Sequence, residues 1–285
     1  MIKRVVSGLV LGAIAIGAIW AGGIYFAVAI ALFTVVALFE LFGALKKKGH
    51  TPIVGAGIIM LLVSVAPIVT EYTAPAIIRF RDIGNVNIFA PVMVAAIIYV
   101  LTAMVVKHKK YNLVDGALTL FGGAYIVYFF SFFVTLRNLE AGAYMTLLAI
   151  IGCIGADTAA FFIGCKFGKK KLIPEVSPNK TVAGSIAAFG GGIAACLAFG
   201  LLLMALDRFP QMAIYHYVII GAIIGAVAQI GDLCASAMKR YCGIKDFGKI
   251  IPGHGGILDR FDAYLLAVPV VYYYYVFFMK FILYR

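Results

Sequence analysis

The chain has 285 residues, of which 64% are hydrophobic and 13% are charged, and its formal net charge is +12. Soluble globular proteins contain about 45–50% apolar and about 25% charged residues, so this composition excludes an ordinary soluble domain. The five cysteines have no CxxC or CxxH spacing and no two histidines have metal-ligand spacing, so a cysteine- or histidine-based metal centre is not indicated.

Apolar runs of about 20 residues indicate membrane-spanning helices, and the chain contains about nine of them. They cover residues 5–20, 24–42, 53–70, 88–106, 117–136, 144–163, 182–206, 213–235 and 261–281. The first run follows MIKR, as in a signal peptide, but no clear A-x-A cleavage site precedes the second run, so we interpret it as a retained helix. Only Gly22 and Gly23 separate the first two runs, which predicts a tight hairpin. The sequence therefore predicts an all-α polytopic integral membrane protein.

The basic residues favour one orientation in the membrane. If the N-terminus is cytoplasmic and the runs alternate, 18 of the 24 lysines and arginines fall on cytoplasmic segments. Cytoplasmic loops of membrane proteins carry such an excess. We therefore expect a cytoplasmic N-terminus and an odd number of spans.

The two halves of the chain differ in the polarity of their loops. We expect residues 1–136 to form N-terminal transmembrane helices whose short basic loops, KKKGH and KHKK, set the topology. Residues 137–285 contain two long polar segments on the cytoplasmic side, at 166–180 and 238–260. We interpret this half as a C-terminal catalytic transmembrane region.

Aspartates interrupt two of the apolar runs near their cytoplasmic ends. In QIGDLCASAMKRYCGIKD, Asp232, Ser236, Lys239 and Arg240 are spaced i, i+4, i+7 and i+8, so on a helix they share one face. Asp232 lies about 10 Å inside the charged boundary of its run, and Asp157 lies about 13 Å inside that of the sixth run. An acid within a membrane helix is costly and faces a cavity or a partner. A purely structural bond to a neighbouring helix is the alternative for each aspartate.

A second polar motif, KDFGKIIPGHGGILDRFD, occupies residues 245–262. Asp259 and Asp262 are three residues apart at the start of the ninth run and share a face there. The glycines of PGHGG permit positive φ and allow backbone N–H groups to approach an anion, and a helix N-terminus begins beside them. The flanking basic residues are Lys239, Arg240, Lys245, Lys249 and Arg260.

These features suit the chemistry of phosphates. Clustered carboxylates repel one another unless a cation joins them, and oxygen ligands beside basic residues suit Mg²⁺ that bridges carboxylates and substrate phosphates. Such a site is equipped for phosphoryl or nucleotidyl transfer. The positive cytoplasmic segments attract anionic substrates, and we expect no nucleic-acid partner.

The segment 236–262, SAMKRYCGIKDFGKIIPGHGGILDRFD, resembles the signature of the phosphatidate cytidylyltransferases, also called CDP-diacylglycerol synthases. The resemblance extends to DTAAFFIGCKFG (157–168), LIPEVSPNKT (172–181) and GDL (231–233), and weakly to TLFGGAYIVYFF (119–130). The first hundred residues are similar to the family only in being apolar helices. The resemblance implies that phosphatidate and CTP give CDP-diacylglycerol and pyrophosphate, with Mg²⁺, in a cytoplasmic cavity of a commonly dimeric membrane protein.

We assign roles to these residues as hypotheses. The metal ligands are Asp232, Asp259 and Asp262, supported by Asp246. Lys239 and Arg240 hold the phosphates of CTP or the leaving pyrophosphate, and Ser236 completes the catalytic set. The substrate-binding residues are Ser177, Asn179, Lys180, Thr181, Lys245, His254, Gly255, Gly256, Arg260 and Asp157. A structural role in the turn is the alternative for His254. The nucleophile is an oxygen of phosphatidate, so no protein nucleophile is expected.

Two departures and two rival functions remain open. Ala183 and Ala235 stand where the family commonly has glutamate, which leaves the number of metal ions undecided. A CTP-dependent lipid kinase of the polyprenol or phytol type would use similar residues and is distinguished by its products, a phospholipid and CDP. A transporter would place ionisable residues near the midplane of the membrane, whereas here they crowd one end of three helices.

Overall fold

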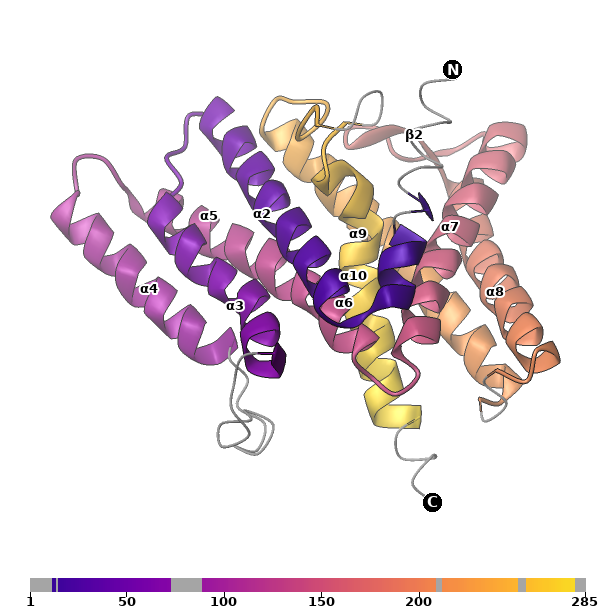
Figure 1. Ribbon diagram of the computed structural model, residues 1–285. Helices are drawn as coiled ribbons and strands as arrows, with labels where there is room; N and C mark the ends of the chain where they lie inside the picture. Colours follow the sequence, from indigo (N-terminus) through magenta and orange to yellow (C-terminus); the bar gives the residue numbers. More distant parts are fainter. Residues whose placement is uncertain (1–11, 14, 73–88, 209–211, 251–254, 280–285) are drawn as a thin grey trace. The chain divides into compact units, whose positions relative to one another are not determined.

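The computed structural model describes residues 12–13, 15–72, 89–208, 212–250 and 255–279 (Figure 1). Its α-helices are α2 (Gly23–Lys47), α3 (Val54–Tyr72), α4 (Phe89–Val106), α5 (Leu113–Gly123), α6 (Phe129–Arg137), α7 (Gly142–Phe167), α8 (Val182–Ala205), α9 (Ile214–Tyr241) and α10 (Leu258–Tyr274). Two π-helical segments, η2 (Ala124–Tyr128) and η3 (Tyr275–Met279), and two strands, β1 (Lys171–Ile173) and β2 (Ser177–Thr181), complete the described elements.

Seven helical stretches of the described chain are long and apolar enough to cross a membrane. Each overlaps one of the predicted runs, which confirms a polytopic helical membrane protein. The run at 53–70 corresponds to α3, where the apolar helix Val54–Ser64 is shorter than a full span. Half of the run at 5–20 lies outside the described residues, so the count of nine and the side of the N-terminus stay predictions.

Gly22 interrupts the helical chain between the first two predicted runs. Residue 21 is helical and α2 begins at Gly23, while Gly22 and Gly23 have φ values of 61° and 47°. Glycine adopts such positive φ values without steric cost. The break therefore occurs at the glycine pair that the sequence indicated.

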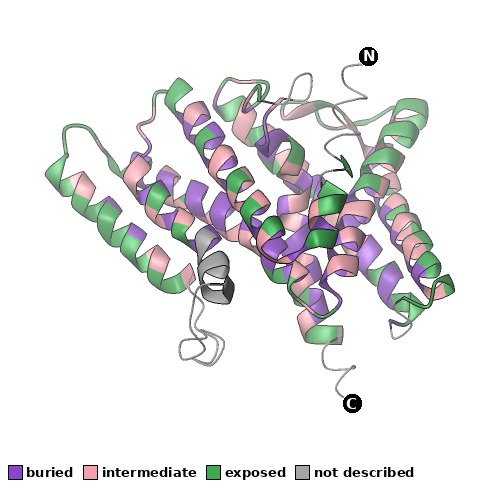
Figure 2. Cartoon of the chain, in the orientation of Figure 1, coloured by how far each residue is buried: buried purple, intermediate pink, exposed green. Residues whose placement is uncertain are grey.

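Helix α4 illustrates how the apolar exterior is arranged. Most of its residues are exposed or half-buried (Figure 2), and the exposed ones include Val94, Ile98, Leu101 and Val105. A helix with so much apolar surface is unfavourable in water, whereas in a bilayer this surface meets lipid tails of the same polarity. The exposure pattern thus agrees with the membrane assignment made from composition.

The chain forms two compact units. The first comprises Met1–Val134 and Tyr241–Arg260, and the second comprises Thr135–Arg240 and Phe261–Arg285. The first three residues of α10 belong to the first unit and the rest of that helix to the second. The functional division predicted at residue 136 stays a prediction.

Glycines bring the helices of the first unit together. A Cβ on Gly57 of α3 would meet Phe42 and Leu38 of α2, and a Cβ on Gly123 at the end of α5 would meet the side chain of Met60. Small residues allow membrane helices to approach closely enough for dispersion contacts to hold them. The buried face of α2 therefore packs against a glycine of α3, where no side chain keeps the two helices apart.

A buried carboxyl group fixes the start of α5 in the first unit. Asp115 accepts the backbone N–H of Asn112 at 3.2 Å, and Asn112 accepts that of Asp115 at 2.8 Å, which is a capping box. The other oxygen of Asp115 accepts the backbone N–H of Thr51 at 2.7 Å. The loop before α3 is thereby tied to α5.

Small residues also organise the second unit. The buried residues of α8 include Gly184, Ala188, Gly192, Cys196 and Gly200, which lie four apart and form one stripe along the helix. A Cβ on Gly191, next to this stripe, would meet the backbone of Gly155 in α7. A Cβ on Gly192 would meet the backbone of Gly221 and Gly225 in α9. Helices α7, α8 and α9 thus meet at backbone distance.

The polar segment at 166–180 is a β-hairpin, whereas the sequence predicted only a loop. Strands β1 and β2 pair antiparallel, with Lys171 opposite Thr181 and Ile173 opposite Ser177. Thr181 ends the hairpin and also caps α8, because its hydroxyl oxygen accepts the backbone N–H of Gly184 at 3.1 Å. The hairpin therefore leads directly into a helix N-terminus.

Candidate active site

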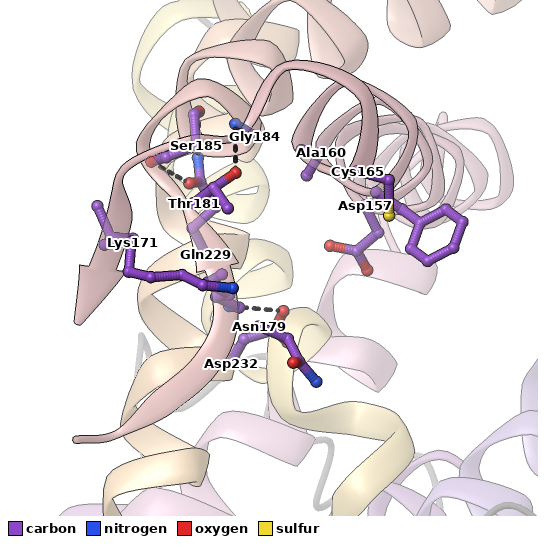
Figure 3. Close-up of a pocket in the computed structure, with 15 residues that line it drawn as sticks. Asp157, Ala160, Cys165, Lys171, Asn179, Thr181, Gly184, Ser185, Gln229 and Asp232 are labelled. Atoms are coloured by element: carbon purple, nitrogen blue, oxygen red, sulfur yellow. Dashed lines mark hydrogen bonds and ion pairs between the residues drawn. The ribbon is translucent and has the colours of Figure 1, made fainter. Parts of the chain in front are cut away.

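The second unit contains a cavity of about 590 Å³. Its wall is built by α7, the hairpin, the N-terminal turn of α8 and α9 (Figure 3). Five residues assigned to the site from the sequence line it, namely Asp157, Asn179, Lys180, Thr181 and Asp232. The structure thus brings together residues from three segments that are far apart along the chain.

A salt bridge joins the hairpin to α9 in the cavity wall. The Nζ of Lys180 lies 3.0 Å from Oδ2 of Asp232, and the two side chains are 27% and 23% exposed. The charge of Asp157, which points into the cavity in Figure 3, also interacts with both of these groups. Two carboxyl groups therefore share the field of one ammonium group.

The N-terminal turn of α8 supplies the opposite side of the cavity. Thr181 and Gly184 both line it, and a Cβ on Gly168 would meet Thr181. Because glycine stands at this position, the end of α7 packs directly against the cap of α8. The dipole of a helix N-terminus favours an anion such as phosphate.

Gln229 and Ser185 also line the cavity, although the sequence analysis did not select them. Gln229 donates from Nε2 to the carbonyl oxygens of Ser185 at 3.1 Å and Gly225 at 2.5 Å, and its Oε1 accepts the hydroxyl of Ser185. These bonds fix the amide in one orientation. A glutamine inside the apolar run 213–235 was the available signal.

Asp262 approaches Asp232 because two helices cross closely. A Cβ on Gly231 of α9 would collide with the backbone of Asp262 and Ala263 in α10. The Asp262 carboxyl group consequently lies in the field of Asp232 and of Lys239, and its Oδ1 accepts the backbone N–H of Ala263 at 3.0 Å. The glycine preceding Asp232 thus allows an oxygen-rich pair to form.

Asp259 lies in the first unit and organises the glycine segment. Its Oδ2 accepts the backbone N–H groups of Phe247 at 2.8 Å and Gly256 at 3.0 Å, and the residue is 6% exposed. Gly255 has a φ of 86°, as expected for a glycine in this turn. The expectation that Asp259 meets Asp232 at one metal ion stays a prediction.

The remaining predicted residues fall into different environments. Lys245, Asp246 and Arg260 are exposed, and Ser236 and Lys239 are half-buried on α9. Arg240 donates from Nε to the carbonyl oxygen of Val176, in the turn of the hairpin that also carries Ser177, at 3.4 Å. Gly256 is buried, and His254 lies outside the described residues.

One of the two departures from the family pattern faces the protein interior. Ala235 is 0% exposed, so its methyl group packs inside the unit, while Ala183 is half-buried in the first turn of α8. A glutamate at position 235 would require burial of a longer acid among packed helices. Alanine at this position is therefore accommodated by the packing seen here.

The oxygen donors fit a magnesium ion that is completed by its substrate. Across the described residues, no group of three or more His, Cys, Asp and Glu side chains has the arrangement of a metal site. Mg²⁺ commonly uses only one or two protein carboxylates and takes its other ligands from phosphates and water. The pair formed by Asp232 and Asp262 matches this requirement in number and in donor type.

Known proteins resemble this chain along its whole length. The profile of the cytidylyltransferase family matches residues 2–278. The phosphatidate cytidylyltransferase of Bacillus subtilis (strain 168) is 31% identical over 274 residues, which is 96% of this chain and 97% of that protein. The phosphatidate cytidylyltransferase of Synechocystis sp. is 31% identical over 300 aligned residues, or 95% of each chain. That of Staphylococcus saprophyticus is 36% identical over 179 residues, which is 63% of this chain and 66% of that protein.

Proposed function

The chain belongs to the cytidylyltransferase family, and from this premise we propose that it transfers the cytidylyl group of CTP to phosphatidate. The products are CDP-diacylglycerol and pyrophosphate, which makes the protein a nucleotidyltransferase of phospholipid biosynthesis. One observation carries the proposal beyond family membership: Lys180, Asn179, Thr181, Asp157 and Asp232 line a single cavity. A pocket that combines an ammonium group, a helix N-terminus and carboxyl groups suits anionic phosphates and a cation.

The proposed reaction needs no protein nucleophile. An ionised oxygen of the phosphatidate phosphate attacks the α-phosphorus of CTP and forms a new P–O bond. The bond between the α-phosphorus and the bridging oxygen to the β-phosphate breaks, and pyrophosphate leaves with that electron pair. Positioning and charge neutralisation dominate such transfers, so the protein acts by holding two anions in line.

Different residues bind the substrate phosphates, orient the headgroup and neutralise the leaving group. Lys180 and the first turn of α8 bind phosphate, with Ser177, Asn179 and Thr181 orienting the headgroup. Lys239 and Arg240 neutralise the leaving pyrophosphate, assisted by Lys245 and Arg260. Asp157 adds a carboxyl group to the cavity wall, Ser236 completes the catalytic set on α9, and Gly255 and Gly256 shape the turn before α10.

Asp232 and Asp262 would hold Mg²⁺, with Asp259 and Asp246 contributing from the glycine motif. When bound, the ion would neutralise phosphate charge and hold the nucleotide against the protein. Lys180, 3.0 Å from Asp232, would share this carboxyl group with the ion.

The same proposal includes the side of the membrane on which the site opens and the oligomeric state of the protein. The site opens toward the cytoplasm and the lipid, because the basic residues that favour a cytoplasmic location flank its residues. Both substrates are anionic, and the net positive charge raises their local concentration. The protein works as a homodimer in a bacterial-type inner or plasma membrane.

The test is pyrophosphate release by the purified protein in detergent with CTP, phosphatidate and Mg²⁺. We expect release only when all three are present, and formation of CDP rather than pyrophosphate would instead identify a lipid kinase. Asp259→Asn should lower turnover about 100-fold or more, since a carboxylate proposed to hold the divalent ion is lost. Its amide oxygen can still accept the N–H groups of Phe247 and Gly256, so the variant should remain folded. Glu140→Gln, at an exposed turn, is the control, and full activity of Asp259→Asn would remove the metal assignment.

A further inference from the structure

Glu40 is a buried acid in the apolar helix α2, at a distance of more than two hundred residues along the chain from the glycine motif. It is 8% exposed and belongs to the first unit. A charged side chain in such a place is costly unless its oxygens are satisfied. Its hydrogen-bond partners therefore indicate why the acid is there.

Both oxygens of Glu40 accept backbone N–H groups at the start of α10. Ile257 donates to Oε1 at 3.1 Å, and Leu258 donates to Oε2 at 2.9 Å. The first N–H groups of a helix have no partner within the helix, and a negative charge there is stabilised by the helix dipole. Helix α2 thus caps α10 with a side chain instead of leaving the cap to the preceding loop.

Two glycines of the motif form the pocket for this carboxyl group. A Cβ added to Gly248 or to Gly256 would run into the carboxyl group of Glu40. Neither glycine has the positive φ that would by itself explain the absence of a side chain. The space that they leave is filled by Glu40, so glycine and acid form a complementary pair.

Glu40 and Asp259 together hold both ends of the described motif. Asp259 accepts the N–H groups of Phe247 and Gly256, while Glu40 accepts the next two, from Ile257 and Leu258. Four backbone donors are thereby committed to two buried acids. Because Asp259 lies in the first turn of α10, which Glu40 fixes, the direction of the Asp259 side chain depends on Glu40.

We propose that Glu40 is a positioning residue for the active site, which sets the first turn of α10 and thereby the orientation of Asp259. This inference rests on the proposed function in one respect only, namely that Asp259 serves the transfer reaction. Glu40 itself contacts backbone amides of the motif and not the reacting groups. The N-terminal helices accordingly contribute to the site as well as to the membrane anchor.

The decisive comparison is between Glu40→Gln and Asp115→Asn in the full-length protein. Each variant removes the charge of one buried acid that holds two backbone N–H groups of the first unit, Ile257 and Leu258 in one case and Thr51 and Asn112 in the other. Glutamine retains one acceptor oxygen and turns an NH₂ group toward the second N–H group. The two variants therefore serve as controls for each other.

Hydrogen exchange followed by mass spectrometry gives the structural result. Glu40→Gln should accelerate exchange at Ile257 and Leu258 about tenfold or more and leave Thr51 and Asn112 unchanged, and Asp115→Asn should do the opposite. Equal acceleration at both places would mean general loosening of the unit, and no acceleration at Ile257 and Leu258 would also overturn the inference. This result does not depend on which reaction the protein catalyses.

Steady-state kinetics give the functional result. Glu40→Gln should lower kcat about tenfold or more, because a misdirected Asp259 impairs the transfer step, while KM for CTP changes by less than about threefold and Asp115→Asn retains kcat within about twofold. An active wild type with an unaffected Glu40→Gln variant would overturn the inference and leave the proposed function intact. An inactive wild type would overturn the proposed function, and the exchange result would still decide whether Glu40 fixes the turn.

A second pair of variants tests the fit between acid and glycine. Gly256→Ala alone should accelerate exchange at Leu258, because the new methyl group displaces the Glu40 carboxyl group. In the Glu40→Ala background the same substitution should add less than about a further twofold, since the space is already empty. Independent, multiplying effects of the two substitutions would contradict the proposed pairing.

Discussion

At the scale of single residues, Lys180 and Asp232 neutralise each other in the wall of the cavity. An aspartate within a membrane span is unfavourable by about 2.5–3.5 kcal/mol near the centre of a helix. The ammonium group of Lys180, at 3.0 Å, offsets part of that cost. The fold therefore supplies a counter-charge for Asp232.

Lys180→Met should lower the free energy of unfolding by about 1–3 kcal/mol, because the substitution leaves a partly buried carboxylate without its ion-pair partner. It should also reduce kcat/KM for CTP, since a phosphate-binding cation is lost. Melting in detergent and pyrophosphate release measure the two effects.

The control is the double variant Lys180→Met with Asp232→Asn. It should regain most of the stability, because no uncompensated charge remains, and should stay inactive. A Lys180→Met protein as stable as wild type would show that the pair contributes nothing to the fold.

Sequence patterns were most informative where a polar side chain stood out from apolar surroundings. Asp157 and Asp232 were selected for that reason and line one cavity, while their roles in the reaction stay predictions. Glu40 was equally conspicuous in its run, but its partners are the backbone N–H groups of Ile257 and Leu258. Backbone donors carry no sequence signature, so the contact could not be predicted.

At the scale of elements, the stripe of small residues on α8 determines how α7, α8 and α9 pack. Helix association in lipid has no hydrophobic driving force and depends on close van der Waals contact. At Gly192 the backbones of α8 and α9 come close together, because a Cβ there would collide with the carbonyl oxygen of Gly221.

Gly192→Leu should therefore destabilise the protein by about 1–3 kcal/mol or more through overpacking. Gly190→Leu is the matched control, since a Cβ at Gly190 meets nothing within 4 Å. Thermal unfolding in detergent compares them, and equal melting temperatures would contradict a close contact at Gly192.

The helical elements were predictable, but the irregular ones were not. Hydropathy located α2 and α4 to within a few residues, because a span needs a long apolar run. The hairpin was missed, since SPNKT has proline and polar residues that are typical of a loop, and its pairing depends on the turn at 174–176 between the two strands. The π-helical segment η2, inside the span Leu113–Arg137, has no periodicity that separates it from an α-helix.

At the scale of the whole molecule, the distribution of lysine and arginine predicts the orientation. With a cytoplasmic N-terminus and an odd number of spans, the C-terminus lies outside the cytoplasm. A reporter enzyme active only outside the cytoplasm should therefore be active when fused after Arg285 and inactive when fused after Gly49. Activity of the reporter at Gly49 would show that the orientation is the reverse of the predicted one. Inactivity at both positions would indicate an even number of spans.

The small residues along α8 also affect the entropy of the bundle. Glycine and alanine have no side-chain rotamers to lose on burial, so contacts between α7, α8 and α9 form without the loss of freedom that leucines would incur. For the same reason these contacts cannot repack by exchanging rotamers. The arrangement of α7, α8 and α9 is therefore set by their small-residue contacts before any ligand enters the cavity.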